Sequence, residues 1–185
     1  MKGEKSVVKG NIGRALKEAR GTQTQLQLSI EENVSRETIS AYENGRAKLP
    51  PDISRSIVGK KDDPWLAMAV RHEYTRTGPV RLEGKKVDLH RSSTKEKLLE
   101  ELEEAKSFLE KCCMSNHLSF IPSFDRQDLE ETLVQLVDVI TGIEHFLAVV
   151  CEEAEISYLG IWQKHYNKLI ARGYVNQEQI IEGQA

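Results

Sequence analysis

The chain has 185 residues, a length that allows one or two domains with cores of modest size. Its 39% apolar and 30% charged residues are typical of an ordinary soluble protein, and its low aromatic content of 6% favours helix over strand. The N-terminus lacks the apolar stretch of a secretory signal, and charged side chains interrupt the most apolar run, 133–151, so neither a leader nor a membrane anchor is predicted.

The net charge of −3 hides an asymmetry along the chain. Residues 1–61 hold 12 Lys+Arg and 7 Asp+Glu, a net of +5, whereas residues 62–185 hold 14 and 22, a net of −8. This distribution predicts that a polyanion, if one is bound, contacts the first third of the chain. Three cysteines, two of them adjacent, fit neither a disulfide framework nor a metal site and indicate a reduced cytoplasmic protein.

The first two predicted helices have clear ends. Asn11 is a suitable N-cap for a helix that ends at Gly21. Thr24 and Gln27 form the pattern of a capping box for a second helix, which runs to about residue 32. Asn33 follows, and because asparagine tolerates the left-handed conformation, we expect a tight turn there.

Three more short helices are expected before residue 76. Ser35 caps the third, which ends at Asn44-Gly45. The fourth begins at Pro50-Pro51 and is closed by Gly59, and the fifth begins after Asp63-Pro64 and covers residues 65–74.

The rest of the chain predicts longer helices. Residues 80–89 alternate weakly in polarity, as a small hairpin or an extended linker would. A capping box at Ser93 and Glu96 predicts one long helix, a second begins at Asp128 after a loop over 114–124, and a last one covers 157–172. The expected fold is all-α: a five-helix domain over 1–76, a linker or hairpin over 77–91, a bundle of about three helices over 92–175, and a tail over 176–185.

The second and third helices carry a recognisable pattern. It consists of the polar pair Thr24-Gln25, Leu28 and the small Ser29 where two helices cross, a turn at Asn33-Val34, Ile39 as an anchor, and the ending Glu43-Asn44-Gly45-Arg46. In spacing and composition this segment resembles the Cro/cI-like family of helix-turn-helix regulators, the xenobiotic-response-element type, over about residues 11–70. The resemblance implies a lambda-repressor-like domain in a repressor-type regulator of phage or mobile-element origin, with its third helix in the major groove of DNA.

The residues of the third helix support this hypothesis independently. Its apolar positions are Val34, Ile39 and Tyr42, which leaves Ser35, Arg36, Glu37 and Ser40 pointing outwards near its N-terminus. Arg36 could pair with guanine or touch phosphate, and Glu37 could accept from a cytosine amino group or reject wrong sequences. The resemblance also implies a phosphate contact at Gln25, while Asn44, Arg46 and Lys48 are candidates for further phosphate contacts. Glu32 departs from the family pattern and needs a partner or solvent.

The C-terminal part contains a second pattern, E-E-x-x-E at residues 100–104, followed by Gln135-x-x-Asp138. It is similar to MazG-like all-α nucleotide pyrophosphohydrolases, which implies Mg²⁺ ligands at Glu100, Glu101, Glu104 and Asp138. Gln135, however, stands where that pattern needs a carboxylate. The alternative is a solvated glutamate face on a self-associating helix, with Asp138 facing a basic group across a dimer seam.

The sequence as a whole predicts a regulator that binds double-stranded DNA sequence-specifically, acts as a homodimer, and needs no cofactor, metal or catalytic residue. A protein or small molecule could act on the C-terminal domain as an effector. A Mg²⁺-dependent pyrophosphohydrolase with an attached DNA-binding module is the alternative, and an adaptor that binds protein through its helix-turn-helix is the third hypothesis.

Overall fold

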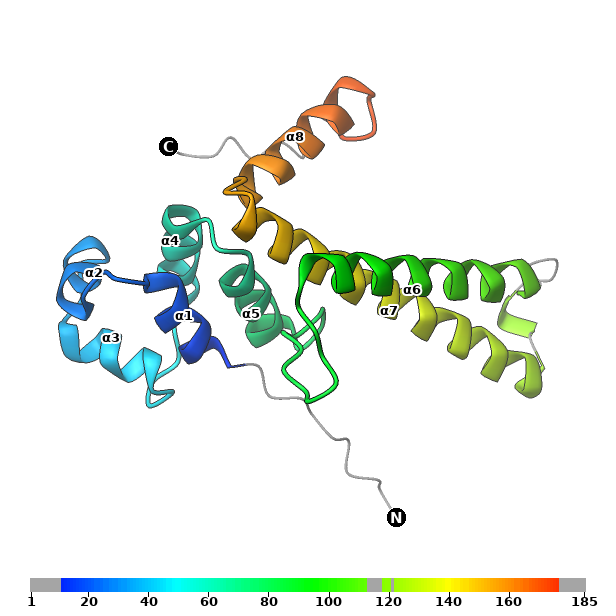
Figure 1. Ribbon diagram of the computed structural model, residues 1–185, viewed down its shortest axis with the longest axis horizontal. Coiled ribbons are helices and arrows are strands. Elements are labelled where there is room, and N and C mark those ends of the chain that lie inside the picture. The colour runs from blue at the N-terminus through cyan, green and yellow to red at the C-terminus, as the bar shows by residue number, and fades with distance from the viewer. Residues whose placement is uncertain (1–10, 113–117, 121, 177–185) are drawn as a thin grey trace, which may run out of the picture.

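The computed structural model describes residues 11–112, 118–120 and 122–176, and all regular secondary structure in these residues is helical (Figure 1). The prediction of an all-α protein is therefore confirmed. The helices are α1 (Ile12–Arg20), α2 (Gln25–Glu31), α3 (Arg36–Glu43), α4 (Pro51–Lys61), α5 (Pro64–Thr75), α6 (Arg91–Lys111), α7 (Ser123–Glu153) and α8 (Tyr158–Ala171), with a short 3₁₀ helix at Leu118–Phe120.

The first five helices begin at the predicted positions, and four of them follow a residue whose side chain caps the helix. The side chains of Asn11, Thr24, Ser35 and Asp63 each accept a hydrogen bond from a backbone N–H in the first turn of the following helix. Thr24 and Gln27 complete the predicted capping box, and Asn33 has a φ of 51°. These helices surround a core whose fully buried members are Leu16, Leu28, Ile39, Ile57 and Leu66.

The end of α4 differs from the prediction. Gly59 lies inside the helix, which continues to Lys61 and ends at Asp62, a residue with left-handed backbone at φ 50°. Glycine tolerates a helix interior at a modest cost, so it is a weaker end signal than the turn that follows it here. The Asp62 carboxylate also accepts a hydrogen bond from the Leu159 backbone N–H at 2.7 Å, which ties this corner to α8.

The segment between α5 and α6 contains no strand among its described residues, so the hairpin expected at 80–89 is wrong and the extended linker is correct. The expected capping box at Ser93 is also wrong. The Ser93 hydroxyl donates to the Asp88 carboxylate at 2.6 Å, and α6 is capped by His90, three residues before the predicted cap. Similarly, α7 begins at Ser123 after Pro122, five residues before the predicted start at Asp128.

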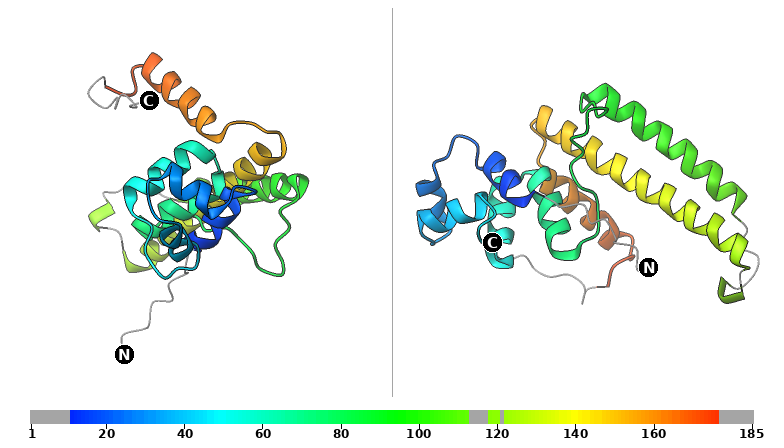
Figure 2. Two further views of the ribbon diagram at one scale, coloured as in Figure 1. Left: turned by 90° about the vertical axis from the view of Figure 1, so that its left-hand side faces the viewer. Right: turned by 90° about the horizontal axis from the view of Figure 1, so that it is seen from below.

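Helices α6 and α7 form a long antiparallel hairpin that extends away from the first five helices (Figures 1 and 2). The two helices approach closely at Gly142, where an added Cβ would lie 3.3 Å from Leu98 Cδ1. Helix α8 is capped by Ser157 and begins within one residue of the predicted start, but it turns away from the hairpin after Glu155, whose φ is 52°. The expected bundle of three helices is not confirmed, since α8 lies beside the end of α7 and near α5 instead.

Helix α5 belongs to two apolar clusters at once. Its Leu66 is buried in the core of the first five helices, whereas Trp65 and Met68 pack with Ala148 and Val149 of α7. Polar contacts reinforce this second cluster: Trp65 Nε1 donates to Glu152 at 2.9 Å, and Arg71 donates to Glu144 at 3.0 Å. The segment 77–90 takes part as well, because the Leu82 backbone N–H donates to His145 Nε2 at 3.0 Å and Leu89 packs on the cluster.

Helix α7 is long and apolar enough, by length and composition alone, to cross a membrane, and 28% of its most apolar window is buried within the fold. Its C-terminal half is covered by α5 and by the first turn of α8, and it holds the buried Glu144, His145, Ala148 and Cys151. Its N-terminal half leaves Leu133, Val134, Val137 and Ile140 about half exposed. The hairpin therefore carries an apolar surface that the described residues do not cover.

Candidate nucleic-acid interface

Helices α2 and α3 form a compact pair on the outer side of the molecule (Figure 1). Leu28 and Ser29 are buried where the two helices cross. The Ser29 hydroxyl donates to the Leu26 carbonyl at 2.8 Å, so its burial leaves no hydroxyl without a hydrogen bond. Ile39 is fully buried beneath α3 and fixes the rotation of this helix about its axis. The polar side of α3 consequently faces solvent.

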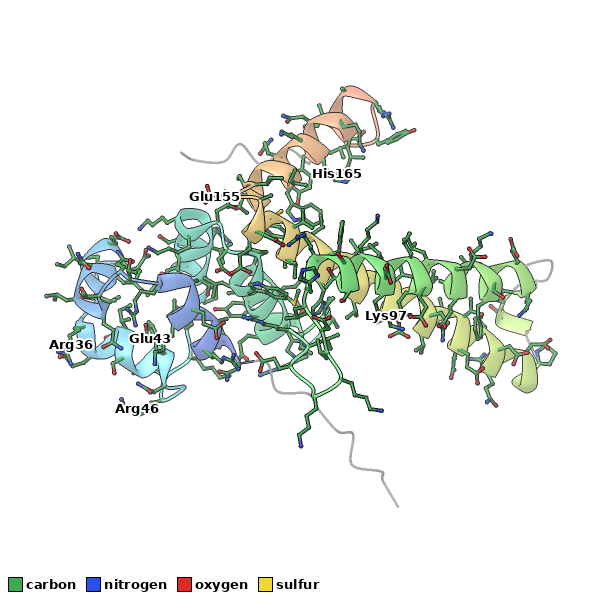
Figure 3. The ribbon with its side chains drawn as sticks, in the orientation of Figure 1. Arg36, Glu43, Arg46, Lys97, Glu155 and His165 are labelled. Atoms are coloured by element: carbon green, nitrogen blue, oxygen red, sulfur yellow. The ribbon has the colours of Figure 1, made fainter. Side chains whose placement is uncertain are left out.

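The predicted contact residues lie together on this side. Ser35, Arg36 and Glu37 are exposed at the N-terminus of α3, and Ser40 is half-exposed one turn further on. Asn44, Arg46 and Lys48 are exposed in the turn that follows the helix. Arg36 and Arg46 lie at the outer side of the molecule in Figure 3, whereas Glu43 points inwards. The site is thus one surface about as long as one short helix and its C-terminal turn.

The basic side chains of the first domain fall into two groups. Arg14, Arg20, Lys60 and Lys61 are engaged in ion pairs with glutamates of the same fold. Within the described residues of this domain, Arg36, Arg46 and Lys48 on the α3 side have no ion-pair partner, and the same holds for Lys17 of α1 and Arg55 of α4. Three of these five cations without an ion pair therefore lie beside α3.

Gln25 differs from the other predicted contacts. Its amide nitrogen donates to the Glu43 carboxylate at 2.6 Å, and that carboxylate also pairs with Arg20 Nε at 2.5 Å. The Glu43 side chain is 3% exposed, so this cluster is buried and joins α1, α2 and α3. One amide N–H of Gln25 is thereby used inside the fold, and its structural role is to hold α2 against α3.

Glu32, which departs from the family pattern, has a partner. Its carboxylate accepts from Lys60 Nζ at 2.8 Å while its own side chain is only 3% exposed, and the same ammonium donates to the Glu31 carbonyl at 3.0 Å. This pair connects the end of α2 to α4. The sequence predicted the need for such a partner but not its identity.

Two structural residues of the site were missed by sequence reasoning. Gly13 is buried where α1 crosses the end of α3, and a Cβ there would lie 2.5 Å from the Glu43 carbonyl oxygen. A glycine inside a helical pattern is a signal for such a close approach. Arg20 carries no comparable signal, because nothing in its spacing distinguishes a buried ion pair with Glu43 from an exposed helix-end arginine.

The carboxylates that the pyrophosphohydrolase alternative would need as Mg²⁺ ligands are not assembled into one site among the described residues. Lys97 donates to both Glu100 and Glu101 at 2.9 Å, while Glu104 is exposed to solvent. Asp138 of α7 lies with Glu101 in the wall of a cavity, and Gln135 is half-buried. Among the residues that the structure describes, no three His, Cys, Asp or Glu side chains are close enough to share a metal ion.

Comparisons with known proteins identify no relative. No family model, no curated protein and no solved structure matches the chain. Function is therefore inferred from the residues and geometry of this chain alone.

Proposed function

We propose that the protein is a regulator that binds double-stranded DNA sequence-specifically, with α3 in the major groove. The observation that carries this proposal is the N-terminal end of α3, where Arg36 and Glu37 are exposed and have no ion-pair partner among the described residues, while Ile39 fixes the opposite side of the helix. A helix of this width fits the major groove, and its N-terminal residues then reach base edges. The unpaired Arg46 and Lys48 supply phosphate contacts that set its register.

The presence of Glu37 favours sequence reading over general attraction to DNA. A surface that bound only phosphate would be weakened by an exposed carboxylate among its cations, since like charges repel. A carboxylate at this place can accept a hydrogen bond from a cytosine amino group, and an arginine beside it can donate to guanine O6 and N7. The adjacent pair thus suits readout of neighbouring base pairs.

Selection from a random pool of duplexes tests the proposal. The wild-type chain is expected to enrich one motif, and Arg36→Ala is expected to relax one position of each half-site at a cost of about 1–3 kcal/mol. Arg126→Ala is the matched control, because Arg126 is an exposed arginine at the far end of the hairpin. It should enrich the wild-type motif unchanged.

Two results would refute this assignment. If no motif is enriched and affinity depends only on salt, the surface binds nucleic acid without reading it. If Arg36→Ala and Arg126→Ala select the same motif with the same affinity, α3 is not the reading element.

We further propose that a second copy of the chain pairs with the exposed apolar surface of the hairpin. On α7, Leu133, Val137 and Ile140 lie four and three residues apart on one side, and each is about half exposed. On α6, Leu102 and Leu109 add further exposed apolar area. Monomeric proteins rarely expose contiguous apolar patches beyond a few hundred Å², and two such hairpins can bury these stripes as a four-helix bundle.

A two-fold dimer would read a near-palindromic site with half-sites roughly 34 Å apart, one turn of DNA. Sedimentation of the wild type is expected to give a dimer, and Val137→Glu a monomer that keeps its affinity for a single half-site. The exposed Arg126→Glu is the control and should remain dimeric. A wild type that stays monomeric both free and on its DNA would refute the dimer, as would flotation of the chain with lipid vesicles through the same surface.

A further inference from the structure

A cavity lies between the hairpin and the segment that connects α5 to α6. Its volume is about 420 Å³, within the range of cavities that hold small organic molecules. Thr94 of α6 and Gly142 of α7 form part of its walls, and Leu82 to Leu89 cover it. Most of the exposed wall area is apolar, but polar side chains from α6, from α7 and from the connecting segment also line the cavity.

Most of the charged groups in this wall are already compensated. Lys97 of α6 (Figure 3) donates to Glu101 and to Glu100 at 2.9 Å, and these two bonds raise the pKa of Lys97. Asp88 accepts from the Ser93 hydroxyl at 2.6 Å and from the His90 backbone N–H at 2.9 Å. The Lys86 ammonium group belongs to an exposed side chain, so water solvates it.

Asp138 is the exception. It is half-buried in the wall, and among the described residues no group donates a hydrogen bond to its carboxylate or forms an ion pair with it. The neighbouring His145 does not serve, because its Nε2 accepts from the Leu82 N–H at 3.0 Å and its Nδ1 therefore donates to the Thr141 carbonyl at 2.8 Å. An anion without a partner beside an apolar wall is a site that a cationic group would stabilise.

We propose that this cavity binds a small organic amine, with the apolar body of the ligand against Leu89 and Gly142 and its ammonium group on the Asp138 carboxylate. The apolar area of the wall accommodates the body of such a ligand, and the Asp138 carboxylate accommodates its charge. An inorganic cation would leave the apolar volume empty, and the three carboxylates of the wall, Asp88, Glu101 and Asp138, outnumber its two lysines, which favours a cation over an anion.

The position of the cavity connects its occupancy to the DNA-binding helices, and this part of the proposal rests on the proposed function. Leu82 is fixed by His145, whose ring lies edge-on to Trp65 of α5 at a centroid distance of 5.5 Å. Arg81 stacks over the same indole at 4.6 Å, and Leu89 packs on the cluster that contains Trp65. A ligand beneath this segment would contact Leu82, Leu89 and His145, which hold α5. Helix α5 packs on α1, and α1 in turn packs on α3.

Calorimetric titration of the full chain with three probes of one shape tests the site. Phenethylamine is expected to bind, phenethyl alcohol to bind about tenfold more weakly because the charge-assisted hydrogen bond is lost, and phenylpropionate not to bind. Asp138→Asn should weaken the amine about tenfold and leave the alcohol unchanged. Asp128→Asn, an exposed carboxylate on the same helix, should change neither affinity.

Three outcomes would overturn the assignment. Equal binding of amine and alcohol that Asp138→Asn does not alter would mean an apolar slot without charge recognition, and preferred binding of phenylpropionate would contradict the role of Asp138. The absence of binding by all three probes to a chain with the wild-type circular dichroism spectrum would refute the site itself.

The regulatory part has its own measurement. Saturating phenethylamine is expected to shift the affinity for the selected DNA motif severalfold in the wild type and not in Asp138→Asn. Amine binding without this shift would refute the coupling alone. Because the calorimetric titration needs no DNA, it tests amine binding in the cavity even if the proposed DNA-binding function is wrong.

Discussion

Replacement of Glu43 by alanine is expected to destabilise the protein far more than an ordinary glutamate substitution. The Glu43 side chain is 3% exposed, accepts from Arg20 and from Gln25, and so leaves a 13% exposed guanidinium without its counter-charge when it is removed. Breaking a buried ion pair from one side costs about 3–5 kcal/mol. Arg20 keeps a hydrogen bond to the Gln23 carbonyl, which places the expected loss of unfolding free energy at about 3 kcal/mol, the lower end of that range.

Urea denaturation of the full chain followed by circular dichroism measures this loss. Glu37→Ala is the matched control, since Glu37 lies on the same helix but is exposed, and it should stay within about 0.5 kcal/mol of wild type. The double variant Arg20→Leu, Glu43→Leu should recover most of the stability, because two apolar side chains of similar size need no counter-charge. If Glu43→Ala costs no more than Glu37→Ala, the buried pair does not stabilise the domain.

Three further predictions concern separate parts of the chain. Gly13→Ala should lower the unfolding free energy by about 1–3 kcal/mol, because the added Cβ overpacks against the Glu43 carbonyl. Gly59→Ala, in a helix interior with open space around it, should raise the unfolding free energy by about 0.5–1 kcal/mol. Equal effects of the two variants in denaturation would contradict the contact at Gly13. Burial lowers the pKa of His145 below 6.5, so at acidic pH the unfolded chain binds more protons than the folded chain. The unfolding free energy should therefore fall as the pH decreases from 7.5 to 5. His145→Gln should reduce this pH dependence in a series of denaturation experiments. Lys48→Ala should reduce the slope of log affinity against log salt by about 1 in DNA titrations without altering the selected motif.

The first five helices could be predicted closely because their ends are encoded locally. A capping side chain bonds to N–H groups two or three residues away, so Asn11, Thr24, Ser35 and Asp63 can be recognised without knowing the fold. The exposed side of α3 followed equally from its few apolar positions. At Gly59 the glycine predicted the end of α4, but the helix continues to Lys61 and ends at the left-handed Asp62, so this prediction was wrong.

The C-terminal part was harder to predict because its ends depend on distant contacts. Ser93 fits a capping box in sequence, yet its hydroxyl bonds to Asp88, and His90 caps the helix instead. The partners of Glu43 and Glu32 lie in other helices, so their ion pairs could not be read from spacing. The sequence offered Asp138 as a Mg²⁺ ligand or as an acid at a dimer seam, and only the packing of the 82–89 segment shows that it borders a cavity.

The sharing of α5 between two cores has a consequence for modularity. A fragment cut after residue 76 would retain Leu66 in its interior but expose Trp65 and Met68 to water. Conversely, a hairpin fragment would lose the helix that covers Ala148 and Val149. The two halves of this chain are therefore not interchangeable units: transplanting the first onto another partner domain would require that domain to present an apolar helix of the same shape.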